Sequence, residues 1–512
     1  MTDIRLAEVL AALSLAGDLG HGRSLEHSLR ATYLACHLGA SVGLDDRERR
    51  NVFYTGLLQA VGCVGNAHAM STEMGMDDIA FKSEIAVANL ADRSAQLKVA
   101  VRHFGSAAGA LRPLVIARAF TERDAPREMT RAHCEVGAMV ARRAGLGEDV
   151  AAGLFSVFER WDGLGQPVGS RGAATPIASR VVAVGIAADL FYLGGDEGVA
   201  LSRISEASGM ALDPDLARAF QELGRRRPLW DALVAPRLWD DCLALEPQPR
   251  HTLDLASLDE LAFTLADFAD VKSPSFVGHS RGVAALAASA ARNLRLGDGE
   301  TGLVRRAALL HDIGRASVPN TILDKPRALT PGERERVRLH VYYTERVLER
   351  SPALSACAPF AGAHHERLDG SGYHRGTKAS ALPMGVRILG AADTFQALTE
   401  PRPYRAAITG EHAASVAMQE AEAGRLDRDA VEAVVAAASG IPPRRVRAPS
   451  TLTDRELEVV RLLGAGHSNR QIAGRLQISE NTARHHLESV YAKLEVTTRT
   501  GAVMQALARG LL

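Results

Sequence analysis

Two short stretches, AALLHDIG at residues 307–314 and AGAHHERLDG at residues 361–370, decide how this chain folds. Each places two adjacent ionisable side chains inside a run that is otherwise rich in Ala, Leu, Ile or Gly. Burying such groups costs free energy unless something compensates them. A metal ion would compensate them, because neutral imidazoles and carboxylates are ordinary metal ligands. The two stretches therefore predict a buried metal site.

The surrounding region supplies further His and Asp residues. The candidate ligands are His279, His311, Asp312, His340, His364, His365 and Asp393. A lone helical His is more often a core or surface residue, so only the group of five His with two Asp indicates a metal. Imidazoles with carboxylates favour Fe, Mn or Zn over Ca or Mg, and a carboxylate such as Asp312 can bridge two ions. Two ions a few ångströms apart activate a water for in-line displacement at phosphorus.

The composition is that of an ordinary folded protein. Of the 512 residues, 46% are hydrophobic and 23% are charged, which excludes disordered, collagen-like and disulfide-scaffold classes and allows about three domains. Five scattered cysteines give neither a disulfide framework nor a cysteine-based zinc site. No signal peptide and no charge-free apolar run of about 18 residues is visible, so we expect a cytoplasmic protein that does not enter a membrane.

Most segments repeat apolar residues at helical spacing, as in residues 283–290, so we predict an all-α chain. The segment GIPPRRVRAPS at residues 440–450 has no such periodicity and indicates a linker, and EPQPR at residues 246–250 indicates a second boundary. The predicted parts are residues 1–246, residues 251–440, a linker at residues 441–450, and residues 451–512.

The formal net charge of zero conceals two opposite parts. Residues 441–512 contain 11 Lys or Arg and 6 Asp or Glu, a net charge of +5, so residues 1–440 carry −5. A basic end on an acidic body is expected when only that end meets nucleic acid.

The first two parts repeat one pattern. LEHSLR around His27 resembles VGHSRG around His279, and matching stretches follow at the same spacing, LLQAVG at 57–62 and LLHDIG at 309–314. His133 and His340 each precede similar segments, FERWDGLGQP and HHERLDGSGY, and the first part holds about 45 extra residues between Cys63 and His133. We therefore predict a duplicated helical domain.

The first copy lacks five of the seven candidate ligands. The positions of His311, Asp312, His364, His365 and Asp393 are taken by Gln59, Ala60, Val157, Phe158 and Ile186. Replacement by apolar residues of similar bulk indicates a site filled in as core. We predict that residues 1–246 form a degenerate copy without metal ligands, serving as a scaffold, a pseudo-dimer partner or a sensor of another ligand.

The second copy resembles the HD-GYP family of metal-dependent phosphodiesterases, which hydrolyse cyclic dinucleotides, above all cyclic di-GMP. The resemblance rests on LLHDIGRASVPNTILDKPRALT (residues 309–330), HHERLDGSGYHRG (residues 364–376) and RILGAADTFQALTEPRPYRAA (residues 387–407), which match in order and spacing. It implies tandem HD-domain helical bundles and two divalent ions, Fe or Mn with Zn as the alternative.

The resemblance also assigns roles to residues. It implies that His279, His311, Asp312 and Asp393 hold one metal and that Asp312, His340, His364 and His365 hold the other. It implies catalytic roles for Asp312 and Arg315, and substrate-binding roles for Lys325, Tyr373, Arg402 and Arg405. For Lys325 and the two arginines of this last set, the alternative is a surface cluster near a helix end.

Three positions depart from the family pattern. Ser275 replaces a Glu that can support a third metal, so we expect two ions. Arg315 stands in place of a Lys, and keeps the charge but not the ability to donate a proton as Lys might. His374 replaces the Pro of the Gly-Tyr-Pro signature after Gly372 and Tyr373.

The C-terminal part carries clear helix signals. Thr453 to Glu456 and Ser468 to Gln471 form two capping boxes, and SENTARHHLESVYAKL at residues 479–494 follows as a third helix with a buried face at helical spacing. Short helices separated by two to six residues, the third of them rich in Thr, Arg, Asn and His, predict a helix-turn-helix.

The stretch from residue 452 to residue 512 resembles the LuxR-type DNA-binding domain almost throughout, a four-helix unit. The resemblance implies that residues 479–494 enter the major groove of DNA, that Glu480, Asn481, Thr482, Arg484 and His485 face the bases, and that Lys493 and Arg499 approach phosphates. It further implies that a fourth helix, at about residues 499–509, helps a homodimer to form.

Three functional hypotheses follow from these patterns. In the favoured one, the chain is a transcription regulator whose two-metal domain binds or hydrolyses a cyclic dinucleotide and thereby controls a DNA-binding dimer. The second is a non-catalytic, metal- or redox-sensing DNA-binding regulator. The third is a nucleotide phosphohydrolase of the wider HD group.

Overall fold

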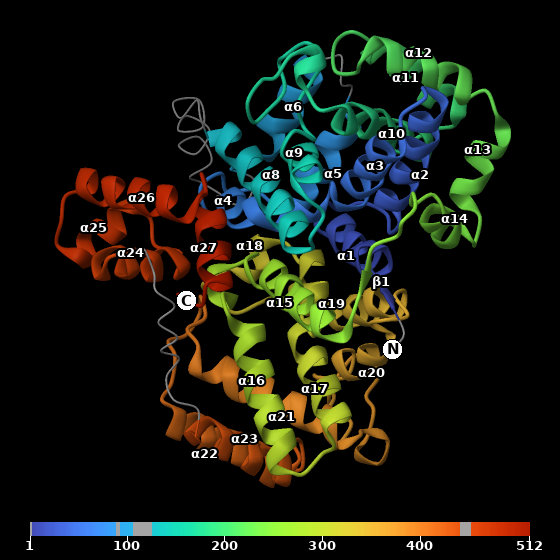
Figure 1. The fold of residues 1–512 in the computed structure, drawn as a ribbon. Coiled ribbons are helices and arrows are strands. Elements are labelled where there is room, and N and C mark those ends of the chain that lie inside the picture. Colours follow the sequence, from blue (N-terminus) through green and yellow to red (C-terminus); the bar gives the residue numbers. More distant parts are fainter. Residues whose placement is uncertain (1–2, 89–92, 106–124, 441–451) are drawn as a thin grey trace. The chain divides into compact units, whose positions relative to one another are not determined.

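The fold is almost entirely helical in the computed structural model, which describes residues 3–88, 93–105, 125–440 and 452–512. This confirms the predicted all-α class. Within the described residues the strands are β1 (Ile4–Arg5) and β2 (Thr252–Leu253), which pair antiparallel. The chain divides into two compact units, Met1–Asp254 and Leu255–Leu512 (Figure 1). The predicted linker at residues 441–450 lies outside the described residues.

The first unit is a helical bundle in which α2 packs against α3 and α10, and α8 packs against α9. Its α-helices are α1 (Leu6–Gly20), α2 (His27–Ser41), α3 (Asp46–Leu58), α4 (Ala67–Thr72), α5 (Asp78–Val87), α6 (Arg93–His103), α8 (Ala125–Arg143), α9 (Glu148–Phe155), α10 (Ile177–Leu193), α11 (Glu197–Ala207), α12 (Pro214–Leu223), α13 (Arg227–Asp231) and α14 (Leu238–Ala244). The 3-10 helices are η1 (Val61–Asn66), η3 (Gly172–Ala174) and η4 (Ala232–Val234).

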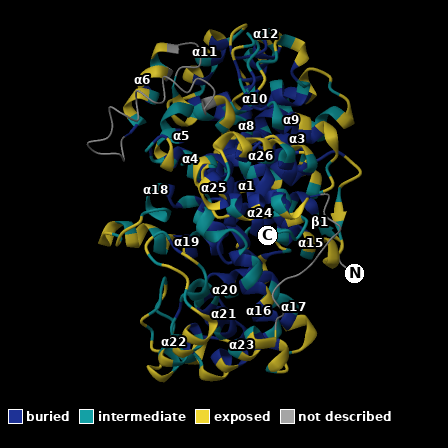
Figure 2. Cartoon of the chain, turned by 90° about the vertical axis from the view of Figure 1, so that its left-hand side faces the viewer, coloured by how far each residue is buried: buried dark blue, intermediate teal, exposed yellow. Residues whose placement is uncertain are grey.

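The second unit begins with a similar bundle, in which α16 packs against α17, α21 and α23, and α19 packs against η6. Its α-helices are α15 (Leu255–Asp270), α16 (His279–Asn293), α17 (Asp298–Leu310), α18 (Asn320–Leu323), α19 (Pro331–Glu349), α20 (Ala358–Ala361), α21 (Met384–Thr399), α22 (Gly410–Glu422) and α23 (Arg428–Gly440). The 3-10 helices are η5 (Pro274–Phe276), η6 (Ile313–Ser317), η7 (Ser355–Cys357) and η8 (Ala379–Ala381). Figure 2 shows buried residues gathered on α16, α17 and α21, and exposed ones on the outer faces of α22 and α23.

The two bundles share helices that match the repeat predicted from the sequence. Helices α2 and α16 have the same length, and each begins at the His that the repeat pairs, His27 or His279. Helices α3 and α17 also have the same length and end directly before the paired positions Gln59 and His311. The extra segment of the first unit lies between η1 and α8, where the structure has α4, α5 and α6.

Fine details repeat as well. A Cβ added to Gly62 would lie 2.0 Å from the carbonyl oxygen of His133, and one added to Gly314 would lie 2.1 Å from that of His340. Both positions therefore require glycine, because any larger residue would push two helical segments apart. The shared packing explains why both glycines persist although the ligands beside them do not.

Four helices end the second unit: α24 (Asp454–Gly464), α25 (Asn469–Leu476), α26 (Glu480–Leu494) and α27 (Arg499–Ala508). Both predicted capping boxes are present, with Thr453 capping α24 and Ser468 capping α25. The buried face of α26 is formed by Ala483, Leu487, Val490 and Leu494, as the spacing predicts.

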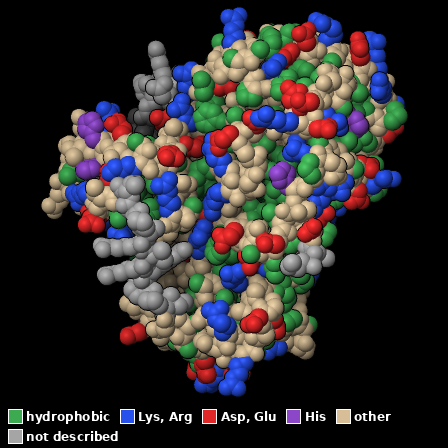
Figure 3. Space-filling model, viewed as in Figure 1, with side chains coloured by type: hydrophobic (Ala, Val, Ile, Leu, Met, Phe, Trp, Pro, Cys, Tyr) green, Lys and Arg blue, Asp and Glu red, His purple; other side chains and the backbone are tan. Residues whose placement is uncertain are grey.

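On the face seen in Figure 3, basic and acidic side chains are interspersed over the molecule.

Candidate metal centre

The candidate ligands are brought together from five segments of the second unit. His279 is the first residue of α16, directly after Gly278, whose φ of +81° turns the chain into the helix. His311 and Asp312 follow the last turn of α17, and His340 lies within α19. The remaining ligands are His364 and His365, which follow α20, and Asp393 in α21.

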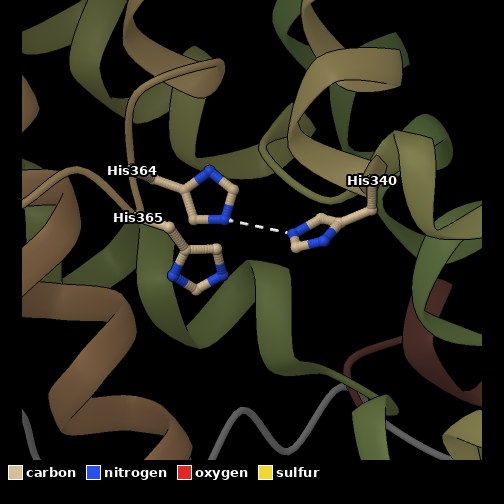
Figure 4. A group of neighbouring side chains, drawn as sticks. All are labelled: His340, His364 and His365. Carbon is tan, nitrogen blue, oxygen red and sulfur yellow. Dashed lines mark hydrogen bonds between the residues drawn. The ribbon is translucent and has the colours of Figure 1, made fainter. Parts of the chain in front are cut away.

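These side chains form two neighbouring groups. One contains His279, His311 and Asp312, and the other contains His340, His364 and His365. In each group the potential ligand atoms all lie within 4.8 Å of one another. Figure 4 shows the three imidazoles of the second group turned toward a common space, with the Nε2 atoms of His340 and His364 3.5 Å apart.

Asp312 lies between the two groups. Its Oδ2 is 2.9 Å from Nε2 of His311 and 3.7 Å from Nε2 of His279. Its Oδ1 is 3.2 Å from Nε2 of His340 and 3.8 Å from Nε2 of His364. One carboxylate oxygen therefore faces each group, which is the arrangement that a bridging ligand requires.

Asp393 approaches from α21. Its Oδ1 is 3.2 Å from Nε2 of His279 and 3.8 Å from Nε2 of His311, and its Oδ2 is 3.8 Å from Nδ1 of His365. The seven residues predicted from the sequence as ligands thus converge on one site.

Hydrogen bonds from Nδ1 to backbone carbonyls fix which nitrogen of each ring faces the site. Nδ1 of His311, His340 and His364 lies 2.7, 2.5 and 2.6 Å from the carbonyl oxygen three residues earlier. An Nδ1–H that donates to a carbonyl leaves Nε2 with a free lone pair, and such outer contacts orient metal-binding imidazoles. The local helical turns therefore aim three Nε2 atoms inward.

His279 is oriented by a carboxylate that the sequence reasoning missed. Its Nδ1 lies 2.8 Å from Oε2 of Glu400, and Glu400 in turn accepts hydrogen bonds from Gln396 and Arg402. Glu400 directly follows the last residue of α21 and has an extended backbone, so no helical spacing in the sequence links it to His279. A carboxylate behind a metal-binding His raises the basicity of the ligand.

The electrostatics of the site follow from burial and from these contacts. Burial works to lower the pKa of His279, but Glu400 and Asp393 outweigh it and raise that pKa to about 9. Burial lowers the pKa of His364 to about 3, and the charge of His311 contributes. Burial opposes ionisation of Asp312, yet Arg315 and His311 hold its pKa well below the usual range.

The donor set fits divalent metal ions. Nε2 of His311 and both carboxylate oxygens of Asp312 are buried and make no hydrogen bond of acceptable geometry, although charged neighbours stand close by. Buried polar atoms are normally satisfied, so these three point to a missing partner. Imidazole nitrogens with carboxylate oxygens are the ligands that Fe, Mn and Zn prefer.

The corresponding place in the first unit is filled differently. Gln59, Ala60 and Val157 are buried there, and Phe158 packs edge-on against His133. His27, which corresponds to His279, has its Nδ1 2.6 Å from Asp189 and its Nε2 2.6 Å from NH1 of Arg23. A guanidinium thus faces the nitrogen that in the second unit faces the site. The sequence predicted that apolar side chains fill this place, and that prediction is incomplete, because the guanidinium of Arg23 also lies there.

The predicted catalytic Arg315 and two of the predicted substrate-binding residues lie beside the ligands. NH1 of Arg315 is 2.6 Å from Oδ2 of Asp312, and Arg402 donates to Glu400 over 3.0 Å and to the carbonyl of Ser275. Tyr373 stacks on His365 with ring centroids 4.8 Å apart.

The other two predicted substrate-binding residues are engaged elsewhere. Lys325 donates to Glu333 over 2.6 Å. Arg405 donates to backbone carbonyls of residues 397, 398, 400 and 406, which satisfies the end of α21. Both contacts match the alternative that these residues are surface or helix-end residues.

The comparisons with known proteins agree with this geometry. A family model for the HD domain matches residues 264–430. The 3'3'-cGAMP-specific phosphodiesterase 3 of Vibrio cholerae is 32% identical over 457 residues, which span 87% of this chain and 97% of that protein. The chain belongs to the HD-GYP family of phosphodiesterases. Because a match over 87% of this chain is longer than the second unit, this similarity to an HD-GYP protein also takes in the first unit.

Further relatives belong to the same group. The crystal structure of a cyclic GMP-AMP specific phosphodiesterase of V. cholerae superposes with a TM-score of 0.61 at 31% identity, covering 86% of this chain and 99% of that one. A cyclic di-GMP phosphodiesterase of Thermotoga maritima is 45% identical over 104 residues, which are 20% of this chain and 28% of that protein. HD-GYP proteins are metal-dependent, in agreement with the donor set.

The C-terminal helices belong to a second family. The model of bacterial regulatory proteins of the luxR family matches residues 450–506. In α26 the side chains predicted to face bases are exposed, namely Glu480, Asn481, Thr482, Arg484 and His485. Lys493 donates to Glu456 over 2.7 Å, and Arg499 donates to the carbonyl of His467 and to Asn469. This HD-GYP chain thus carries a luxR-type DNA-binding domain after its HD domain.

Among the described residues, no helix is both long enough and apolar enough to cross a membrane.

Proposed function

We propose that the second unit is a two-metal phosphodiesterase that hydrolyses a cyclic dinucleotide. The observation that carries this proposal is the position of Asp312, whose two oxygens face two separate His groups. Bound divalent ions would supply an activated water and neutralise the oxygens of the phosphodiester. His279, His311 and Asp393 would hold one ion, and His340, His364 and His365 the other, with Asp312 shared.

Arg315 and Arg402 would bind the substrate. Both guanidinium groups are cations at the edge of the ligand set, and Arg suits two-point contact with phosphate oxygens. Tyr373 would support His365 through ring stacking. Water adds across one phosphorus–oxygen bond of the ring, so the product is a linear dinucleotide with a phosphomonoester and a free hydroxyl.

The relatives narrow the substrate class. Three V. cholerae relatives are named for 3'3'-cGAMP, whereas the T. maritima relative and two others of V. cholerae are named for cyclic di-GMP. Because the longest of these matches is to a 3'3'-cGAMP phosphodiesterase, we propose 3'3'-cGAMP as the first substrate to test, and cyclic di-GMP as the second.

We propose two further roles within the chain. The first unit would be a metal-free copy, since Arg23 faces His27 where an ion would otherwise lie. The luxR-type domain would bind the major groove through α26 as a homodimer, and the nucleotide would control that binding. The exposed side chains of α26 support the first part of this proposal.

Hydrolysis of both nucleotides by the Mn- or Fe-loaded full chain tests the enzymatic proposal. We expect a linear dinucleotide product from the wild type and none from His311→Ala or Asp312→Ala. An unchanged circular-dichroism spectrum and an unchanged thermal unfolding midpoint in both variants would show that they remain folded. If the wild type hydrolyses neither nucleotide, and both variants lose the metal-dependent change in DNA binding that the wild type shows, the chain would instead be a metal-sensing regulator.

A further inference from the structure

One aromatic ring beside the candidate metal centre contacts two guanidinium groups. Phe276, in η5, lies with its ring centroid 4.1 Å from Cζ of Arg315 and 4.5 Å from Cζ of Arg402. The two arginines come from different segments, one from η6 and one from the turn after α21. Both distances lie well inside the range of about 6 Å for a cation–π contact.

The two cations are held close together although they repel. Their side chains are only 12% and 6% exposed. Burial lowers the pKa of Arg402, Glu400 opposes this shift, and the charge of Arg315 adds to it. Each arginine has one carboxylate partner, Asp312 or Glu400, and both of these carboxylates belong to the metal centre. The ring offers its negative face to both guanidinium groups and so offsets part of their repulsion.

The same three positions change together in the first unit. Under the offsets of the repeat, Phe276, Arg315 and Arg402 correspond to Ser24, Cys63 and Gly195. The copy that lacks the ligand set therefore lacks the ring and both of its cations. Within this chain, the ring is therefore present in the copy that has both arginines and absent from the copy that has neither.

We infer that Phe276 is a positioning residue that holds Arg315 and Arg402 as a pair for the phosphate oxygens of the substrate. This inference rests on the proposed function, because it takes the phosphodiester to be the anion bound. Phe276 does not itself touch the reacting atoms. It acts by keeping two long, flexible side chains in one arrangement, which reduces the entropy that they lose on binding.

The test compares Phe276→Leu, which keeps apolar bulk, with Phe276→Tyr, which keeps the aromatic face. In the metal-loaded full chain we expect Phe276→Leu to raise KM for 3'3'-cGAMP and the Kd of inorganic phosphate by about tenfold each. The metal content should not change, and kcat should fall by a smaller factor than the factor by which KM rises. Phe276→Tyr should restore both values to near wild type. Phe263→Leu is the matched control, because Phe263 also carries one guanidinium, Arg281 at 4.8 Å, on a helix outside the site.

Unchanged KM and phosphate affinity in Phe276→Leu, at full metal content, would overturn the inference. Equal losses in Phe276→Leu and Phe276→Tyr would also overturn it, since the aromatic face would then be irrelevant. If the wild type hydrolyses no cyclic dinucleotide, the proposed function fails, and the phosphate titration still decides the inference. If Phe276→Leu does not fold, Phe276→Met takes its place, with Phe276→Tyr again expected to match the wild type.

Discussion

Replacing Glu400 tests whether the metal centre depends on a residue behind the ligands. Glu400 accepts from Nδ1 of His279 over 2.8 Å, and the side chain of His279 is fully buried. A hydrogen bond to a charged partner in such a place is worth about 1.5–3 kcal/mol. Since about 1.4 kcal/mol corresponds to a factor of ten, we expect Glu400→Ala to weaken the ion at His279 by roughly 10–100-fold.

The assay is competition for Mn²⁺ against a chelating indicator, with the two sites resolved by stepwise titration. Glu400→Gln, which keeps an acceptor but loses the charge, should fall between the wild type and Glu400→Ala. The ion at His340, His364 and His365 should be affected less. Glu422→Ala, an exposed carboxylate on α22, is the control. Wild-type affinity for both ions in Glu400→Ala would refute the role given to Glu400.

Three further predictions concern other parts of the chain. Asp312→Asn should remove both ions together and lower hydrolysis by more than about 100-fold. Metal analysis and chromatography of the product measure these two effects. Loss of one ion alone would contradict the bridging role. Burial raises the pKa of Asp18 to about 7, so its own contribution to the stability of the first unit should fall by up to about 4 kcal/mol as pH rises from about 4 to about 7. Burial lowers the pKa of His27 to about 4 and that of His133 to about 3, so these two side chains contribute in the opposite direction. In urea unfolding, the stability of Asp18→Asn relative to the wild type should therefore increase from pH 4 to pH 7, and a difference that does not change with pH would contradict the assignment. Arg484→Ala changes a side chain that is 63% exposed on α26. This variant should weaken binding to a DNA site selected from random sequences by about 1–3 kcal/mol and leave hydrolysis unchanged. Binding equal to that of the wild type would exclude Arg484 from base contact.

Local sequence signals predicted several helix starts, the internal repeat and the candidate ligands. The capping residues Thr453 and Ser468 set helix starts in the C-terminal domain, as predicted. The repeat was visible because residues such as Gly62 and Gly314 are held by close backbone approach, which leaves little choice of residue. Four of the seven candidate ligands stand in adjacent pairs inside apolar runs, which are costly to bury without a partner, and the family resemblance added the other three.

The features that were missed depend on contacts between distant segments. The bond between Glu400 and His279 joins residues 121 positions apart, and the ring of Phe276 meets two arginines from separate turns. Arg23 entered the first unit's site from a loop whose path no periodicity describes, so the sequence predicted apolar filling where a guanidinium lies. Residue types at these positions are readable, but their partners are set by tertiary packing.

Anomalous X-ray diffraction from crystals of the Mn- or Fe-loaded chain tests the central claim most directly. We predict two metal peaks in the second unit, one on each side of Asp312, and none beside His27 and His133 in the first unit. A single peak, peaks that Asp312 does not share, or a metal in the first unit would contradict the account.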